Sequence, residues 1–132
     1  MKNFVVSLVM LIVLPGCSAH LIQAQLDERL EAYNQLLRWN EWDNASLFAR
    51  DSILEEFKRR AAAAKDVRVV DYRILSMAYN AEKREAIVDV EIDYYKVVSN
   101  KMKTLKYTQE WAYSEEKGIK GWRLMSVLPE FR

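Results

Sequence analysis

The apolar and polar positions divide the chain into a helical N-terminal part and a C-terminal part with the pattern of strands. Between residues 21 and 39, apolar side chains recur every three or four positions. They are Ile22, Leu26, Leu30, Tyr33 and Leu37. This spacing places them on one stripe of an amphipathic helix, and charged residues fall off the stripe. Shorter helices are predicted over residues 45–48 and 53–65, after a break in the pattern at 40–44.

From residue 67 onward the apolar spacing changes to the two-residue period of β-strands. Residues 86–98 alternate most clearly, because one phase is apolar and the other is acidic. The apolar phase consists of Ala86, Val88, Val90, Ile92 and Tyr94, and the acidic phase of Asp89, Glu91 and Asp93. The apolar phase is therefore predicted to face the core and the acidic phase to face solvent.

Three further strands are predicted over residues 67–79, 102–113 and 122–128. A break in the alternation at Val69-Val70 predicts a β-bulge in the first of them. Ser99-Asn100 is expected to form a tight turn between the second and third strands. Helices followed by four strands indicate an α+β fold, in which N-terminal helices pack on one face of a curved four-stranded antiparallel sheet.

The first residues have the organisation of a secretory signal peptide. Lys2 supplies a positive charge, and the apolar run from Phe4 to Leu14 is too short for a bilayer-spanning helix of about 20 residues. The run ends in Leu14-Pro15-Gly16-Cys17, which contains the only cysteine of the chain. This tetrapeptide resembles the lipobox of bacterial lipoproteins, although Pro15 departs from its usual small residue. The alternative is an ordinary or uncleaved signal peptide with an incidental cysteine.

The lipoprotein resemblance implies that residues 1–16 are a signal peptide and that Cys17 carries the lipid. In that family the thiol bears a diacylglycerol and the freed amine is acylated, with palmitate-like chains, and two or more chains anchor stably. Residues 17–20 are then the lipidated cysteine and a short tether, and residues 21–132 are a single domain. Ser18 follows the cysteine, which by the same resemblance favours the periplasmic face of the outer membrane over the inner membrane.

Charge and composition limit the classes of partner. The full chain has 20 basic and 19 acidic side chains, so no excess charge favours nucleic acid or an anionic lipid surface. The 4 Trp, 7 Tyr and 4 Phe belong to a packed domain and not to a disordered tether. Membrane contact is therefore expected through the lipid anchor, in the cell envelope, and no nucleic acid partner is expected.

Three segments, in this order of elements, resemble the nuclear transport factor 2-like superfamily, also described as a cystatin-like roll. They are residues 39–48, Val69-Val70-Asp71-Tyr72 and Gly121-Trp122-Arg123-Leu124. The resemblance implies a cone in which a bent sheet wraps a long helix around a cavity. It also implies frequent homodimerisation. Members include enzymes such as ketosteroid isomerase and many non-catalytic binding or assembly modules, so the fold does not choose between them.

The acidic phase of residues 86–98 is not expected to bind a metal ion. If Ser99-Asn100 is a two-residue hairpin loop, Asp93 faces Lys106, Glu91 faces Thr108 and Asp89 faces Glu110. Carboxylates on alternate positions of one strand stand about 6.6 Å apart and do not converge on one point, as a hard cation requires. The sequence predicts a solvated outer face and no metal site.

The inner face carries two polar positions among apolar and aromatic ones, Gln109 and Ser126. If the last hairpin pairs Tyr113 with Trp122, Gln109 faces Ser126. One interpretation is that these groups bond each other or a helix group, because buried polar groups need partners. The other is a cavity that orients a small apolar ligand, with aromatic walls from Tyr72, Tyr94, Tyr107 and Trp111.

Candidates for catalysis are few. An isomerase of this fold needs a carboxylate base in the cavity, and Asp71 is the one strand carboxylate whose phase leaves this open. His20 lies beside the anchor and lacks partners for a relay or a metal site. No glycine-rich phosphate loop is present, and no cofactor is expected. Trp39 and Trp42 have two interpretations, as core residues or as partner contacts.

The sequence therefore favours a membrane-anchored envelope lipoprotein that is a non-enzymatic binding or assembly module. Its expected partner is an envelope protein or a second copy of the chain. A carrier of a small apolar ligand is the alternative, and an isomerase or hydrolase is a third hypothesis. The carrier hypothesis predicts an open cavity on the inner face, whereas the binding module predicts a filled interior and an exposed apolar patch.

Overall fold

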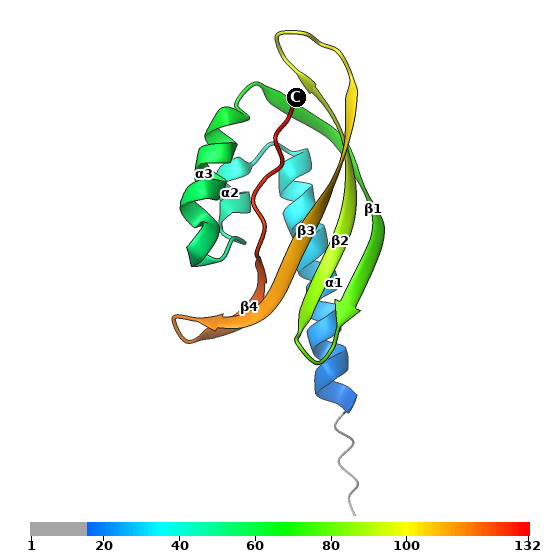
Figure 1. The fold of residues 1–132 in the computed structure, drawn as a ribbon, viewed down its shortest axis with the longest axis vertical. Helices are drawn as coiled ribbons and strands as arrows, with labels where there is room; N and C mark the ends of the chain where they lie inside the picture. The colour runs from blue at the N-terminus through cyan, green and yellow to red at the C-terminus, as the bar shows by residue number, and fades with distance from the viewer. Residues whose placement is uncertain (1–15) are drawn as a thin grey trace, which may run out of the picture.

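A computed structural model describes residues 16–132, which form helices followed by a four-stranded antiparallel sheet that is not closed (Figure 1). The helices are α1 (Gly16–Arg38), α2 (Trp42–Ser46) and α3 (Leu54–Ala63), with a short 3₁₀ turn at Asp51–Ile53. The strands are β1 (Val67–Asn80), β2 (Glu85–Lys96), β3 (Lys103–Glu116) and β4 (Ile119–Leu124), in the spatial order β1-β2-β3-β4. The predicted α+β class and the order of elements are confirmed.

The long helix α1 buries the stripe that its sequence predicts. Leu26, Leu30, Tyr33 and Leu37 are all buried. The helix begins at Gly16, so residues 17–20, predicted as a tether, form its first turns, which extend beyond the end of the sheet in Figure 1. The signal-peptide prediction concerns residues 1–15, which lie outside the described part, and Gly16. Within residues 16–132, no helix combines the length and the apolar character needed to cross a bilayer.

The end of α1 is tied to the start of β1 through Asn40. Asn40 has a positive φ of 58°, and the N–H of Glu41 bonds the carbonyl of Leu36 at 2.9 Å, as in a Schellman motif. The Asn40 side chain accepts a hydrogen bond from the Val69 N–H at 3.0 Å. One residue therefore ends the helix and fixes where the first strand passes it.

The two faces of β2 are as the alternation predicts. Its apolar phase is buried and packs under the helices, and this side is called the inner face here. The register of β1 on β2 shifts between Val69 and Asp71, which confirms the predicted bulge, and shifts again between Ile74 and Ser76. Because of these shifts, Val70 and Leu75 have no partner on β2.

The predicted pairing of β2 with β3 is wrong by two residues. Asp93 pairs with Thr104, Glu91 with Lys106 and Asp89 with Thr108. The connection is longer than a two-residue hairpin, because the Asn100 N–H bonds the Lys96 carbonyl at 2.9 Å and residues 97–102 lie outside both strands. An even shift keeps every side chain on its predicted face.

The last strand is shorter than predicted, since β4 ends at Leu124. Tyr113 pairs with Trp122, as expected, but the chain leaves the ladder after Met125, whose N–H bonds the Glu110 carbonyl at 2.7 Å. The remaining residues fold back over the inner face, where the Phe131 ring packs against Tyr94 at 5.1 Å. On the other side of β4, Ala49 forms a parallel bridge with Leu124.

Aromatic side chains fill the space between the helices and the inner face. The Tyr33 ring lies 5.5 Å from Trp111, 5.7 Å from Phe48 and 6.4 Å from Phe57. All four side chains are buried. Edge-to-face packing of this kind adds to the burial of apolar area, so α1, α3 and β3 are held together at this point.

Candidate functional site

The polar positions of the inner face form one hydrogen-bonded cluster with α1. The Gln109 Nε2 donates to the Asn34 Oδ1 at 2.8 Å, and the Asn34 Nδ2 donates back to the Gln109 Oε1 at 3.3 Å. Gln109 also donates to the Tyr107 hydroxyl at 2.7 Å and accepts from the Trp111 indole N–H at 3.2 Å. Gln109 is therefore partnered by a helix group and not by Ser126, as one of the two interpretations from the sequence expected.

Asn34 is the member of this cluster that the sequence analysis missed. It is fully buried, and its Nδ2 also bonds the Leu30 carbonyl at 2.9 Å. A signal was present, because Asn34 stands four residues after Leu30 and thus continues the apolar stripe of α1. A polar residue on a core-facing stripe predicts a buried partner.

The two phenols beside this cluster are kept protonated. Burial raises the pKa of Tyr107 well above its ordinary value, and the bond from Gln109 offsets only part of that effect. Burial also raises the pKa of Tyr33, which is fully enclosed. A general base needs a pKa near the working pH, so neither phenol is suited to proton transfer.

The other inner-face candidates have partners in the protein itself. The Tyr94 hydroxyl donates to the Arg132 carbonyl at 2.5 Å. The Ser126 hydroxyl accepts the Glu110 N–H at 3.0 Å, at the point where the chain leaves β4. Trp111 is buried in the aromatic core. The predicted pairing of Gln109 with Ser126 is therefore wrong, because the last strand ends before that position.

Four surface clefts of about 290 to 500 Å³ are formed by the described residues. Tyr72 is the one ligand-binding candidate that lines any of them. The others, Tyr94, Tyr107, Gln109, Trp111 and Ser126, line none of the four. Five of the six candidates lie on the inner phase of the sheet, and Ser126 bonds the backbone of β3 beyond the end of β4. The six do not surround a common one of these clefts.

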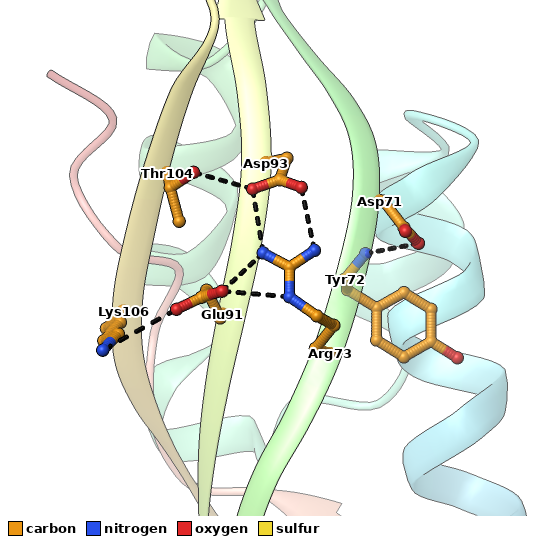
Figure 2. Close-up of polar contacts among 7 residues, drawn as sticks. All are labelled: Asp71, Tyr72, Arg73, Glu91, Asp93, Thr104 and Lys106. Carbon is orange, nitrogen blue, oxygen red and sulfur yellow. Dashed lines mark hydrogen bonds and ion pairs between the residues drawn. The ribbon is translucent and has the colours of Figure 1, made fainter.

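The acidic residues of β2 form ion pairs and hydrogen bonds across the outer face, as Figure 2 shows. The Arg73 guanidinium donates two bonds to Asp93, at 2.8 and 2.9 Å, and its Nε donates to Glu91 at 2.9 Å. Thr104 donates to Asp93 at 2.8 Å. Hydrogen bonds from Arg73 and then from Thr104 lower the pKa of Asp93 to about 2. The fork geometry of arginine suits such bidentate pairing.

The hydrogen bonds of the β2 carboxylates are relevant to whether these residues could bind a metal ion. Asp89 is bonded separately, by the hydroxyls of Ser76 and Thr108 at 2.8 and 2.9 Å. Among the described residues no cluster of three or more His, Cys, Asp or Glu side chains has the geometry to hold a metal ion. The carboxylates therefore act as acceptors in a ladder, and Arg73, which the sequence analysis did not single out, is the group that links two of them.

Asp71 does not have the position of a catalytic base. Its Oδ1 accepts the N–H of Tyr72 at 2.9 Å, and Figure 2 shows it apart from the Arg73 cluster. It lines none of the four clefts. His20 is exposed on the first turns of α1, and the side chain of Cys17 lies outside the described residues.

One cleft lies between α1 and β1, with a volume of about 340 Å³. Its lining is Asp27, Leu30 and Glu31 from the helix and Tyr72, Ile74 and Met77 from the strand. Burial and then the charge of Glu31 raise the pKa of Tyr72. Ile74 and Met77 belong to the inner phase of β1 but are exposed, and they line this cleft beside α1. This exposed surface was not predicted from the sequence, because the alternation of apolar and polar residues in β1 is irregular.

Trp39 and Trp42, at the end of α1, were interpreted as core residues or as partner contacts, and the structure gives one of each kind of environment. The Trp42 ring packs against Phe131 at 6.0 Å, which is a core role. Trp39 is 69% exposed, and the structure places the guanidinium of Arg38 5.9 Å from its ring centre. Trp39 is thus available for contact with another molecule, together with Leu47, which is also exposed.

Comparison with known proteins gives the fold and no activity. No protein-family model and no curated protein matches the sequence. The chain is similar to a SEC-C motif-containing protein from Psychrobacter arcticus, with a TM-score of 0.61 and 9% identity over 82% of this chain and 63% of that one. It is also similar to the intermembrane space region of the chloroplast protein ARC6, with a TM-score of 0.48 and 12% identity over 80% and 92% of the two chains. The chain spans less than two thirds of the length of the first of these structures.

Proposed function

We propose that this protein is a lipid-anchored module of the bacterial cell envelope that binds or assembles another protein and catalyses no reaction. One observation carries the proposal. The polar groups that would orient a ligand bond each other, whereas apolar side chains are exposed near the ends of α1 and on β1, at one edge of the sheet. A filled interior leaves the surface as the place of interaction. Contiguous exposed apolar side chains are typical of interaction sites.

The anchor is the part of the proposal that rests on the sequence. Acylation of Cys17 would hold the domain at the periplasmic face of the outer membrane and raise its effective concentration for partners on that membrane. The experiment is labelling of cells with a palmitate analogue, comparing the natural chain with Cys17→Ser. We expect the label and membrane fractionation in the natural chain only. Equal labelling of the two chains would refute the anchor.

We also propose that the domain is a member of the nuclear transport factor 2-like superfamily. Support comes from the order of elements, from the long helix that packs on the inner face, and from the strong twist of the sheet in Figure 1. In that superfamily many members are binding modules without catalytic residues. The absence of a carboxylate from the apolar phase of β2 fits such a role.

Binding itself is tested in intact cells by photocrosslinking of the full chain. A photoreactive amino acid is placed at Trp39, at Leu47 and at Met77, which are exposed on different parts of the surface. We expect a cross-link to a specific protein from at least one position, and its loss when the Cys17→Ser chain is used. If no position yields a cross-link while a soluble lipid or other small molecule co-purifies with the domain, the carrier hypothesis replaces this one.

A further inference from the structure

The two edge strands of the sheet, β4 and β1, differ in how many of their outward backbone groups are hydrogen-bonded by the rest of the chain. At the β4 edge, the Arg50 N–H bonds the Leu124 carbonyl at 3.0 Å and the Leu124 N–H bonds the Phe48 carbonyl at 2.8 Å. At the β1 edge, Asn40 covers the N–H of Val69, but between Arg73 and Tyr79 no outward backbone group bonds another part of the described chain. The first edge is therefore partly covered, whereas the second is open over several residues.

The open part of β1 has only one of the features that discourage strand addition. Proteins protect exposed edges with lysines, prolines, β-bulges or a covering segment. The exposed stretch of β3 has Lys103 and Lys106, whereas the stretch from Ile74 to Tyr79 has no charged residue and no proline. Its side chains are apolar or small, and residues 73–78 are exposed on both faces. The bulge at Leu75 is the one irregularity in this stretch.

The cleft between α1 and β1 supplies side-chain contacts next to this edge. Leu30, Ile74 and Met77 make an apolar floor, where alternate side chains of an added strand would pack. Asp27 and Glu31 form the rim on the helix, and neither makes an ion pair with another described residue. They are four residues apart on one helix face, where like charges repel. A cation from a partner would remove that repulsion.

A second copy of this chain does not fit the edge. In a symmetric antiparallel pair of β1 strands, both copies carry α1 on the same side of the joined sheet. The acidic rims formed by Asp27 and Glu31 would then face each other across the joint. The open stretch of β1 offers no compensating cation. Arg73 is engaged by Glu91 and Asp93, and Arg68 lies near the start of the strand, where it bonds the carbonyls of Lys65 and Val67. The charge pattern therefore favours a different protein with basic residues.

We infer that the open edge of β1 and the adjoining cleft bind an extended segment of a partner protein, which adds to the sheet as a further strand. The segment has apolar side chains at alternate positions, facing Ile74 and Met77, and a lysine or arginine that reaches Asp27 and Glu31. Backbone hydrogen bonds supply affinity in this mode, and the side-chain positions supply specificity. The inference rests on the proposed function, since it names the partner chemistry of a binding module.

The first test uses the full chain in detergent micelles and a short labelled peptide that alternates valine with threonine and has lysine at both ends. We expect binding by fluorescence anisotropy, at least tenfold weaker when the lysines are replaced by glutamates. The Asp27→Asn/Glu31→Gln double variant should remove this preference. Asp43→Asn/Glu55→Gln is the matched control, because both residues are exposed on other helices, and it should keep the preference.

Two further peptides report on the backbone. Both keep the sequence of the first and are N-methylated at every second residue, one in each of the two possible phases. Strand addition predicts that one of the two methylated peptides loses binding by tenfold or more, because the methyl groups replace the N–H groups that would bond the β1 edge. Equal affinity of the lysine and glutamate peptides, or full binding by both methylated peptides, would overturn the inference.

The second test separates this inference from the proposed function. A photoreactive amino acid at Met77 of the full chain should cross-link in cells to a partner segment with alternating apolar residues and a nearby lysine or arginine. The yield should fall at least fivefold in the Asp27→Asn/Glu31→Gln background. Cross-links between two copies, or cross-links from Trp39 or Leu47 alone, would overturn the inference and leave the proposed function standing. A lack of cross-links from all three positions would count against both.

Discussion

Asn34 on α1 and Gln109 on β3 bond each other through both atoms of their side-chain amides, at 2.8 and 3.3 Å. The pair is buried, and Tyr107 and Trp111 complete the bonding of Gln109. Buried amides without partners are costly, so this pair fixes how the long helix sits on the sheet. The polar groups at the centre of the inner face therefore bond each other and hold the fold together, and they are not free to orient a ligand.

The pair predicts unequal effects of removing either partner. Gln109→Leu leaves three groups without a bond and should lower the free energy of unfolding by about 2–5 kcal/mol, whereas Asn34→Leu should cost about 1–3 kcal/mol. The double variant should cost less than the sum of the two, because each single change orphans the other amide. Urea unfolding followed by circular dichroism measures all three. Strict additivity would contradict the pairing.

Trp111 is one of the two buried tryptophans of the core, and its removal tests the assignment of the inner face. Trp111→Ala should lower the free energy of unfolding by about 3–5 kcal/mol, because it leaves a cavity among Tyr33 and Phe48. Trp39→Ala is the control, since Trp39 is exposed, and it should change stability by no more than about 0.5 kcal/mol. Similar losses for the two would mean that the faces of β3 are misassigned.

The pairing of Arg73 with Asp93 makes stability depend on acid pH. The folded-state pKa of Asp93 is about 2, below the unfolded value of about 3.9. Its contribution is therefore complete above about pH 4 and is lost as the pH falls toward 2. Asp93→Asn should flatten the decline in the urea midpoint over this range, and Arg73→Gln should do the same. If neither substitution changes the slope, the ion pair does not form in solution.

Asn40 combines two roles that substitutions can separate. Asn40→Gly keeps the positive φ and loses the bond to the Val69 N–H, so it should cost about 1 kcal/mol. Asn40→Ala loses the bond and also strains the backbone, which should add about 1–2 kcal/mol. The order of the two unfolding free energies is the measurement. An alanine variant as stable as the glycine variant would show that the left-handed turn is not retained.

Prediction from the sequence succeeded where one element carries its own pattern. The stripe of α1 and the alternation of β2 gave the correct buried faces, because helical and strand periods depend on local geometry alone. The break at Val69-Val70 correctly gave a bulge. The partner of Asp93 was wrong, because the turn before β3 is longer than two residues, and turn length sets the register.

The candidate site shows the same division. The sequence placed Gln109 on the inner face but assigned it to Ser126, although its partner is Asn34, 75 residues earlier in the chain. Arg73 was not singled out, because its acceptors lie on the neighbouring strand and depend on the pairing of β1 with β2. The exposure of Ile74 and Met77 depends on how α1 packs beside β1, which no local pattern records.

The sequence by itself determined the class of fold, the order of the elements and the faces that α1, β2 and β3 bury. It also contains the whole basis for the proposed lipid anchor at Cys17. The tertiary structure alone decided that the polar centre of the interior is closed on itself and that the β1 edge is left open. The physical reason is that periodicity is a property of a few consecutive residues, whereas bonding partners and open edges depend on segments that only folding brings together.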